Sequence, residues 1–188
     1  MLRKKITPLK TFIEEGSDME SIRSLFSSFR CSRNKDVIHY LDNYALKNEL
    51  LGTSRNYLIF APDGNLAAFF TVALTAIDCS TLSNRRKRDA FGDMPALSKR
   101  THVEGYLLTQ VARDDRYSHE DIDGKELIQE AEKTIDAAAA IAGGHIISLD
   151  CKERLVSYYE SCGYKTLFYD EEKELYKLFK CLDELSVA

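Results

Sequence analysis

Hydrophobic residues near the start of the chain recur at helical spacing. The segment Ser17-Asp-Met-Glu20 has the pattern of a capping box and predicts a helix over 18–29. The apolar face of this helix would consist of Ile22, Leu25, Phe26 and Phe29. A second helix is predicted over 35–51 and would end at Gly52. The apolar face of the second helix would consist of Val37, Ile38, Leu41 and Ala45.

Runs rich in β-forming residues follow the two predicted helices. YLIF at 57–60 and LAAFFTVAL at 66–74 flank the segment APDGN, whose Asp-Gly pair is a strong hairpin signal. We therefore expect an antiparallel strand pair. The next stretch, 78–102, is polar, has no sustained period and contains Gly92 and Pro95. It is predicted to be a long loop with room for a short helix, and loops of that length often serve function.

The second half of the chain alternates strands with helices. VEGYLLTQVA at 103–112 and HIISLD at 145–150 are predicted strands, and the second has the look of a buried parallel strand. The polar segment RDDRYSHEDIDG and then a helix ending at Gly143-Gly144 separate them. The apolar set of that helix is Leu127, Ile128, Ala131, Ile135, Ala138, Ala139 and Ala142. Strand, helix and strand in this order predict a parallel crossover.

A second helix and a strand pair are predicted to close the chain. The helix covers 152–162. Its predicted inward side consists of Leu155, Val156 and Tyr159. YKTLFY and LYKLF, separated by DEEKE, form the final antiparallel pair. The sequence therefore predicts one mixed α/β domain over 1–188, with a helical part at 1–52 and a sheet over 57–180.

Composition narrows the class of protein and its location. The 188 residues are 44% hydrophobic and 30% charged, as in globular proteins, and no apolar run is long enough to cross a bilayer. The opening MLRKKITPLKTF lacks the features of a secretory signal. Five cysteines without a C-x-x-C pair suit reduced thiols better than disulfides or a zinc site. We expect a cytoplasmic protein without a metal ion.

Charge is distributed unevenly along the chain. The formal net charge is −4, which gives no overall attraction to nucleic acid. Cations nevertheless cluster in NRRKR at 84–88 and SKR at 98–100. If this cluster lines a substrate groove, a phosphate-bearing acceptor such as tRNA becomes a candidate. A solvated charged surface is the competing interpretation.

Four features in order carry a resemblance to a known family. They are the hairpin ending in FFTVAL, the strand LLTQVARD, the helix opening at Gly124 and the block ISLDCKERLVSYYESCGY. Over 57–180 the chain resembles the GNAT superfamily of acyl-CoA N-acyltransferases. The segment FRCSRNKDVIHYLDNYA at 29–45 is similar to the branch that includes toxin-type acetyltransferases of toxin and antitoxin pairs. The family's aromatic pair, Gly and final aromatic match Tyr158, Tyr159, Gly163 and Tyr164.

The resemblance implies a mixed sheet with helices on both faces, whose central parallel strands, 103–112 and 145–150, splay to admit acetyl-CoA as co-substrate. Pantetheine contacts would come from Gln110, Val111, Ala112 and Arg113. The family's phosphate loop falls on His119-Glu-Asp-Ile122-Asp-Gly124, where only the last glycine matches. The expected loop ligands are Arg116, His119, Ile122, Asp123, Gly124 and Lys125. Because Glu120, Asp121 and Asp123 would repel a pyrophosphate, we expect weak binding or acidic side chains that turn outward.

The resemblance also assigns catalytic roles. Tyr159, four residues before Gly163, would protonate the leaving thiolate, since a tyrosine pKa of about 10 lies near that of a thiol. Tyr158 would pack or meet the substrate. Glu104 is the candidate general base, with His102 as the second choice. Cys151 and Cys162 are interpreted as small packing residues rather than nucleophiles.

Three functions follow as hypotheses. The first is an acetyl-CoA-dependent N-acetyltransferase that acts on a primary amine of a small molecule or protein by direct attack in a ternary complex. The second is a toxin-type enzyme acting on aminoacyl-tRNA, with an antitoxin protein as partner. The third is a non-catalytic binding protein that keeps the fold, motivated by the missing loop glycines. A homodimer is a further partner to consider, and no membrane association is expected.

Overall fold

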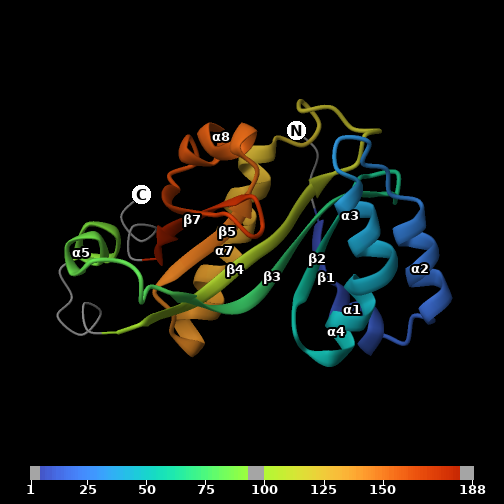
Figure 1. The fold of residues 1–188 in the computed structure, drawn as a ribbon. Coiled ribbons are helices and arrows are strands. Elements are labelled where there is room, and N and C mark those ends of the chain that lie inside the picture. Colours follow the sequence, from blue (N-terminus) through green and yellow to red (C-terminus); the bar gives the residue numbers. More distant parts are fainter. Residues whose placement is uncertain (1–4, 93–99, 183–188) are drawn as a thin grey trace. The chain divides into compact units, whose positions relative to one another are not determined.

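The computed structural model describes residues 5–92 and 100–182 and contains a mixed seven-stranded sheet in the order β1-β2-β3-β4-β5-β7-β6 (Figure 1). The strands are β1 Lys5–Pro8, β2 Arg55–Phe60, β3 Leu66–Asp78, β4 His102–Arg113, β5 Ile146–Cys151, β6 Lys165–Asp170 and β7 Leu175–Cys181. β1/β2, β2/β3, β5/β7 and β6/β7 are antiparallel, and β4/β5 is parallel. This arrangement confirms the predicted mixed α/β class.

The helices alternate with these strands along the chain. They are α1 Leu9–Glu14, α2 Met19–Ser27, α3 Lys35–Tyr40, the π-helical turn η1 Leu41–Ala45, α4 Leu46–Leu51, α5 Asn84–Phe91, α7 Gly124–Ala142, the 3-10 turn η2 Glu153–Leu155 and α8 Val156–Glu160. The chain divides into two compact units: the N-terminal unit, Met1–Ala73 with Leu108–Ala131, and the C-terminal unit, Leu74–Leu107 with Glu132–Ala188. The prediction of a single domain stays a prediction.

The core of the N-terminal unit lies between its helices and the strands β2 and β3. Helix α1 packs on β2, and α2 packs on the π turn (Figure 1). The buried cluster comprises Leu9, Ile22, Phe26, Phe29, Val37, Leu41, Ala45, Leu46, Leu58, Leu66, Phe69 and Ala112. The apolar faces predicted for the first two helices supply half of this cluster, so the helical periodicity correctly identified the buried sides of these helices.

The N-terminal unit differs from the sequence prediction in one helix cap, in two short elements that were missed and in a π turn within a predicted helix. The N-cap of α2 is Asp18 rather than Ser17, because the Asp18 carboxylate accepts a hydrogen bond from the Ser21 N–H at 2.8 Å. β1 and α1 were missed, since four and six residues are too short to show a period. The predicted helix over 35–51 is continuous but contains the π turn, and it ends at Gly52 with φ +72°, as predicted.

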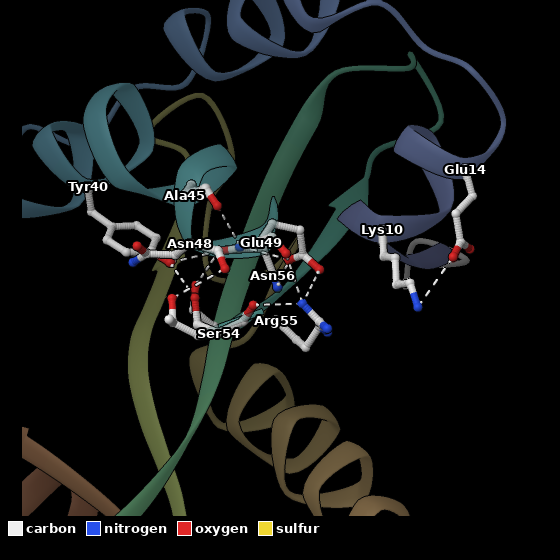
Figure 2. Close-up of polar contacts among 11 residues, drawn as sticks. Lys10, Glu14, Tyr40, Ala45, Asn48, Glu49, Ser54, Arg55 and Asn56 are labelled. Atoms are coloured by element: carbon white, nitrogen blue, oxygen red, sulfur yellow. Dashed lines mark hydrogen bonds and ion pairs between the residues drawn. The ribbon is translucent and has the colours of Figure 1, made fainter. Parts of the chain in front are cut away.

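A buried polar network fastens this helix to β2 (Figure 2). One oxygen of Glu49 accepts hydrogen bonds from the backbone and side-chain N–H groups of Asn56, at 2.7 and 3.0 Å, and the other accepts from Arg55 at 3.3 Å. Asn56 also donates to the Ala45 carbonyl at 3.1 Å and accepts from the Tyr40 hydroxyl at 3.0 Å. Because the Glu49 side chain is only 1% exposed, these donors replace the water it loses.

The C-terminal unit is organised around the parallel pair of strands. Gly105 lies opposite Ile146, and Leu107 lies opposite Ser148. A Cβ at Gly105 would come within 2.2 Å of the Ile146 carbonyl oxygen, so glycine is required for this close approach. The buried cluster of the unit consists of Ile77, Cys79, Leu82, Phe91, Val103, Ile146, Leu167 and Phe179. The crossover predicted from the strand and helix order is confirmed.

One prediction for the C-terminal unit needs correction. The helix expected over 152–162 is reduced to η2 and the short α8, and Leu155 is exposed rather than on an inner face. The short helix that the prediction allowed within 78–102 is present as α5, which carries the cations of NRRKR. Pro95 and Lys99, also named for that stretch, lie outside the described residues.

Candidate active site

Asp114 anchors the end of β4 in the N-terminal unit. This carboxylate is fully buried and accepts hydrogen bonds from the Arg30 N–H, the Arg116 N–H and the Arg116 guanidinium, all at 2.8 Å. Burial alone would raise the pKa of Asp114, but the hydrogen bonds from Arg116 and Arg30 outweigh burial and hold it below its usual value. The loop that follows β4 is therefore fixed to the segment around Arg30.

Arg116 differs from its predicted role as a cofactor ligand. Its guanidinium makes a two-pronged ion pair with Asp114 through Nε and Nη2, so two of its three nitrogens are already engaged. Arg113 lies closer to the predicted phosphate loop, because one of its guanidinium N–H groups donates to the Ile122 carbonyl at 2.7 Å. Its Nε is buried and has no hydrogen-bond partner within the part of the chain that the structure describes. Arg113 therefore offers an unused donor beneath the predicted phosphate loop.

The predicted phosphate loop satisfies its own backbone with its acidic residues. Asp121 accepts from the backbone and hydroxyl of Ser118, at 2.8 and 2.9 Å, which lowers the pKa of Asp121. Asp123 accepts the Lys125 N–H at 3.0 Å and so caps helix α7. Acidic side chains that turn outward were one of two outcomes predicted from the sequence. Asp121 and Asp123 instead accept hydrogen bonds from within the loop and the start of α7. Because Asp123 holds an N–H group at the helix start that a phosphate would use, it competes with an anion there.

The other predicted loop ligands have mixed surroundings. His119 and Lys125 are exposed and could meet a polyanion. Ile122 is buried, and its N–H donates to the Ser118 carbonyl at 3.1 Å, so it packs rather than binds. On β4, Ala112 belongs to the buried core, whereas Gln110 and Val111 are half-buried. Gly124 opens helix α7, as predicted.

We expect Asp123→Asn to tighten the binding of acetyl-CoA about fivefold. Asparagine keeps the helix cap but removes a negative charge beside the polyanion, a repulsion of about 1 kcal/mol near a protein surface. Calorimetric titration of the variant and the parent protein measures the two Kd values. Glu120→Gln, an exposed charge in the same loop, is the matched control and should change affinity less. Equal affinity in parent and Asp123→Asn would place the pyrophosphate away from the start of α7.

Tyr159 is packed among aromatic rings in the C-terminal unit. Its ring meets the Tyr158 ring edge to face at 5.4 Å and the Tyr164 ring at 5.9 Å. Its carbonyl accepts the Cys162 and Tyr164 N–H groups, at 2.9 and 3.2 Å. The YYESCGY segment thus folds back on itself, and the turn after α8 holds Tyr159 in place.

The surroundings of Tyr159 keep its hydroxyl protonated. Burial, helped by the neighbouring Cys151 thiol, raises the pKa of Tyr159 to about 12. This value is higher than the 10 assumed from the sequence, so the hydroxyl can donate a proton but cannot serve as a base near neutral pH. Cys151 is the last residue of β5, and its thiol is close enough to affect the pKa of Tyr159. Tyr159 therefore lies near the carboxyl end of β5.

Glu104 and Tyr159 are not brought together. Glu104 precedes Gly105, which pairs with Ile146, the first residue of β5. Tyr159 lies near Cys151, the last residue of β5. β5 has six residues, so its ends are about 17 Å apart at roughly 3.3 Å per residue. The Glu104 side chain is also 57% exposed and pairs with Arg100 at 2.9 Å. The structure therefore gives no support to Glu104 as the base for a reaction at Tyr159.

The surroundings of Glu104 and His102 are those of ordinary surface groups. The pKa of Glu104 is lowered, first by a hydrogen bond from its own N–H and further by Arg100, which makes the carboxylate a weaker base. His102, the second choice, is exposed and its Nδ1 lies 3.0 Å from the Thr101 hydroxyl. Glu104 and His102 are both exposed, so neither has the buried setting typical of a catalytic base.

The buried cysteines are packing residues, as predicted for Cys151. Burial raises the pKa of Cys151 to about 11, so its thiol stays protonated and is a poor nucleophile. Cys79 is fully buried, and burial raises its pKa in the same way. In residues 5–92 and 100–182, no group of three or more His, Cys, Asp or Glu side chains could hold a metal ion.

Helix α5 presents three exposed arginines, Arg85, Arg86 and Arg88. Arg85 makes a long ion pair with Asp89 at 3.9 Å. Lys87 is buried instead and donates to the Arg100 carbonyl at 2.9 Å. Phe91 anchors the helix by packing on Phe179, with ring centroids 5.1 Å apart. The cationic side of α5 is therefore fixed in place and accessible to an anionic partner.

Sequence reasoning missed two groups beside the predicted site. Asp114 could have been noticed as a charged residue between strand and loop with an arginine two positions on. The buried pair of Glu132 and Lys180, 3.0 Å apart, joins residues 48 positions apart and leaves no local signal. No helix within the described ranges is both long and apolar enough to cross a membrane.

Comparisons with known proteins identify the fold. No family profile and no curated protein matches the sequence. The fold is similar to AtaT complexed with acetyl-methionyl-tRNAfMet, with a TM-score of 0.71, 15% identity and 98% of each chain covered. It is similar to a tyrosine-to-phenylalanine variant of KacT, with a TM-score of 0.72, 13% identity and 97% of each chain covered. At such identities the likeness shows the fold alone.

A third solved structure has the same fold. It is an AtaT toxin variant bound to the C-terminus of the antitoxin AtaR and acetyl-CoA, with a TM-score of 0.67 and 14% identity. The match covers 98% of this chain and 96% of that one. The chain thus has the fold of toxin structures over nearly its full length, as the resemblance predicted.

Proposed function

We propose that the chain is an acetyl-CoA-dependent N-acetyltransferase that acetylates the amino group of an aminoacyl-tRNA. The observation that carries this proposal is Tyr159, a protonated and largely buried tyrosine near the carboxyl end of β5. The likeness to AtaT structures that contain acetyl-CoA or acetyl-methionyl-tRNAfMet supports it. The acceptor predicted from the sequence is a primary amine. The similarity of this fold to AtaT complexed with acetyl-methionyl-tRNAfMet favours charged tRNA among such acceptors.

Acetyl-CoA would supply the acetyl group as a thioester. In the N-terminal unit, the half-buried Gln110 and Val111 would contact the pantetheine arm, and Arg113 and Lys125 would hold the pyrophosphate. The Nε–H of Arg113 is buried without a hydrogen-bond partner among the described residues, which supports a role for this side chain in holding an anion. Asp123 opposes the pyrophosphate, so its carboxylate would have to move or take a counter-ion.

Tyr159 would hold the proton needed by the departing sulfur at its hydroxyl oxygen. A tyrosine with a pKa of about 12 gives up its proton less readily than one near 10. The apolar surroundings that raise the pKa of Tyr159 would also raise that of a thiol placed beside it, which keeps the two groups closer in proton affinity. The acceptor amine must attack in its neutral form, and an α-amino group needs little help because its pKa is about 8.

The cationic side of α5 supports a nucleic-acid acceptor. Arg85, Arg86 and Arg88 are exposed on one short helix, and arginine suits phosphate contacts through paired N–H groups. Such contacts supply affinity without reading sequence, so they would leave the choice of amino acid to other residues. An antitoxin protein partner is part of the same proposal.

The proposal is tested by offering labelled acetyl-CoA with three acceptors: charged tRNA, deacylated tRNA and a lysine-containing peptide. Label that appears on charged tRNA, and leaves with the amino acid when the ester is hydrolysed, supports the proposal. Label on the peptide alone would keep an N-acetyltransferase and reject the tRNA acceptor. Label on none of the three, with no acetyl-CoA binding, would reject both.

We expect kcat/KM to rise with pH through the acceptor's pKa near 8 and then to stay level up to about pH 10. Tyr159 acts in its protonated form, and a pKa of about 12 means that this form persists well above pH 10. A tyrosine at its ordinary pKa of about 10 would instead be half ionised there. Initial rates, corrected for ester hydrolysis, measure the profile, and a fall centred near pH 10 would contradict this environment for Tyr159.

A non-catalytic binding protein is the second candidate. Asp123 caps α7 where a pyrophosphate would bind, and Asp114 engages two of the three guanidinium nitrogens of Arg116. Both features would weaken a coenzyme site. Calorimetry separates the candidates, because millimolar acetyl-CoA without measurable binding would favour a protein that keeps the fold without the chemistry.

A further inference from the structure

A buried lysine lies behind the turn that holds Tyr159. Lys180, on β7, donates to Glu132 of α7 at 3.0 Å and to the Cys162 carbonyl at 3.2 Å. Its ammonium also lies 5.8 Å from the centroid of the Tyr164 ring, in a cation–π contact. The two charged side chains are 14% and 7% exposed. Lys180 therefore ties helix α7 to the turn that contains Cys162 and Tyr164.

The groups that Lys180 holds are those in contact with Tyr159. The Cys162 and Tyr164 N–H groups both donate to the Tyr159 carbonyl, and the Tyr164 ring packs on the Tyr159 ring. Gly163, between them, has φ +90°, a conformation that glycine allows. A Cβ at Gly163 would lie 3.4 Å from Lys180 Cε, so the lysine stem closes over this turn.

The cluster is not optimised as a stabilising ion pair. One oxygen of Glu132 and the Tyr164 hydroxyl are buried and make no hydrogen bond of good geometry among the described residues, although Glu132 is close enough to the hydroxyl to help burial raise the pKa of Tyr164. Buried polar groups left unpaired cost stability, and well-packed apolar residues often replace buried ion pairs without loss of stability. Stability is therefore a weak explanation for this pair, and the geometry that it imposes on its neighbours is a better one.

We propose that Lys180, with Glu132 as its counter-ion, is a positioning residue for Tyr159. By holding the Cys162 carbonyl and the Tyr164 ring, it fixes the Gly163 turn and thereby the direction of the Tyr159 hydroxyl. The proposal rests on the proposed function in one respect, the role of Tyr159 as proton donor. It adds that this role requires a charged pair that acts on Tyr159 through the Gly163 turn.

The test replaces the whole pair with apolar residues of similar size. Glu132→Leu with Lys180→Met leaves no buried charge behind, so the double variant should fold, as circular dichroism and Tm will show. We expect kcat to fall roughly tenfold or more, because small misplacement of a catalytic group is costly, while the acetyl-CoA Kd stays within about twofold. Lys177→Met is the matched control, a lysine of the same strand with 12% exposure that pairs with Asp150.

Two further readouts separate positioning from a general structural role. When Tyr159→Phe is added to the double variant, kcat should fall no further than in Tyr159→Phe alone, because the pair acts through that hydroxyl. The ring signal of Tyr159 in carbon-13 tyrosine spectra, assigned by its loss in Tyr159→Phe, should move in the double variant and not in Lys177→Met. An unmoved ring signal, an unchanged kcat or additive losses would each overturn the proposal. If no acceptor is acetylated, the proposed function fails, and the ring signal still decides whether the pair positions Tyr159.

Discussion

Tyr159→Phe is expected to lower kcat for acetylation of charged tRNA about a hundredfold or more, which is the usual effect of removing a general acid. The change deletes one hydroxyl and keeps the ring, so the edge-to-face contacts with Tyr158 and Tyr164 persist. Acetyl-CoA affinity should stay within about twofold, because the predicted coenzyme contacts lie on β4 and α7. Steady-state rates and calorimetry on one preparation measure both quantities.

Tyr158→Phe is the matched control for this experiment. Tyr158 is the neighbour of Tyr159 on α8 and shares its aromatic contact, yet it was expected to pack or meet substrate. Its variant should keep kcat within about threefold. If Tyr159→Phe retains full activity, the tyrosine is a packing residue, and the thiolate must take its proton from water. If both variants lose activity equally, the pair acts through packing rather than through one hydroxyl.

Glu49→Ala is expected to destabilise the protein by about 3 to 5 kcal/mol, the range observed when one partner of a buried charge pair is removed. The variant removes the acceptor of the Asn56 backbone N–H and of one of its two side-chain N–H groups, while the other still donates to the Ala45 carbonyl (Figure 2). Urea unfolding measures the change. A fall in Tm of about 10 °C should accompany it for a chain of this size.

Figure 2 also contains the control for Glu49. Glu14 pairs with Lys10 at 3.3 Å on the exposed side of α1, where both side chains are more than half exposed. Glu14→Ala should change the free energy of unfolding by no more than about 0.5 kcal/mol, since surface pairs of this spacing contribute little. Equal effects of the two substitutions would mean that the Glu49 network does not fasten the helix to β2.

The sequence predicted the fold because its long elements have strong periods. Helix α7 and the hairpin of β2 and β3 were found from apolar spacing and from an Asp-Gly turn, which are local signals. The elements that were missed or shortened, such as β1 and α8, have four and five residues and depend on tertiary contacts. Long elements with a strong period are therefore enough to recognise a fold, even where elements of four or five residues are not predicted correctly.

The candidate site was less predictable, because its charges act across the fold. Arg116 was expected to bind phosphate, and only the structure reveals that Asp114 occupies its guanidinium. Glu104 was chosen for its place at the start of a strand, but the parallel register with β5 puts it at the far end from Tyr159. Spacing along the chain identified Tyr159, whereas partners and distances required the fold.

Because of the π turn at Leu41–Ala45, the number of residues in the continuous helix over 35–51 matters as much for its packing as their identity. Buried residues recur every four positions at Val37, Leu41, Ala45 and Glu49, and in a regular α-helix each such step drifts by about 40°. The wider π turn absorbs this drift and returns Glu49 to the side that faces Asn56. Deleting one residue there would rotate α4 by about 100° and carry Glu49 away from its partners. In related chains, insertions and deletions should therefore be found in the loops on either side of this helix and be absent from within it.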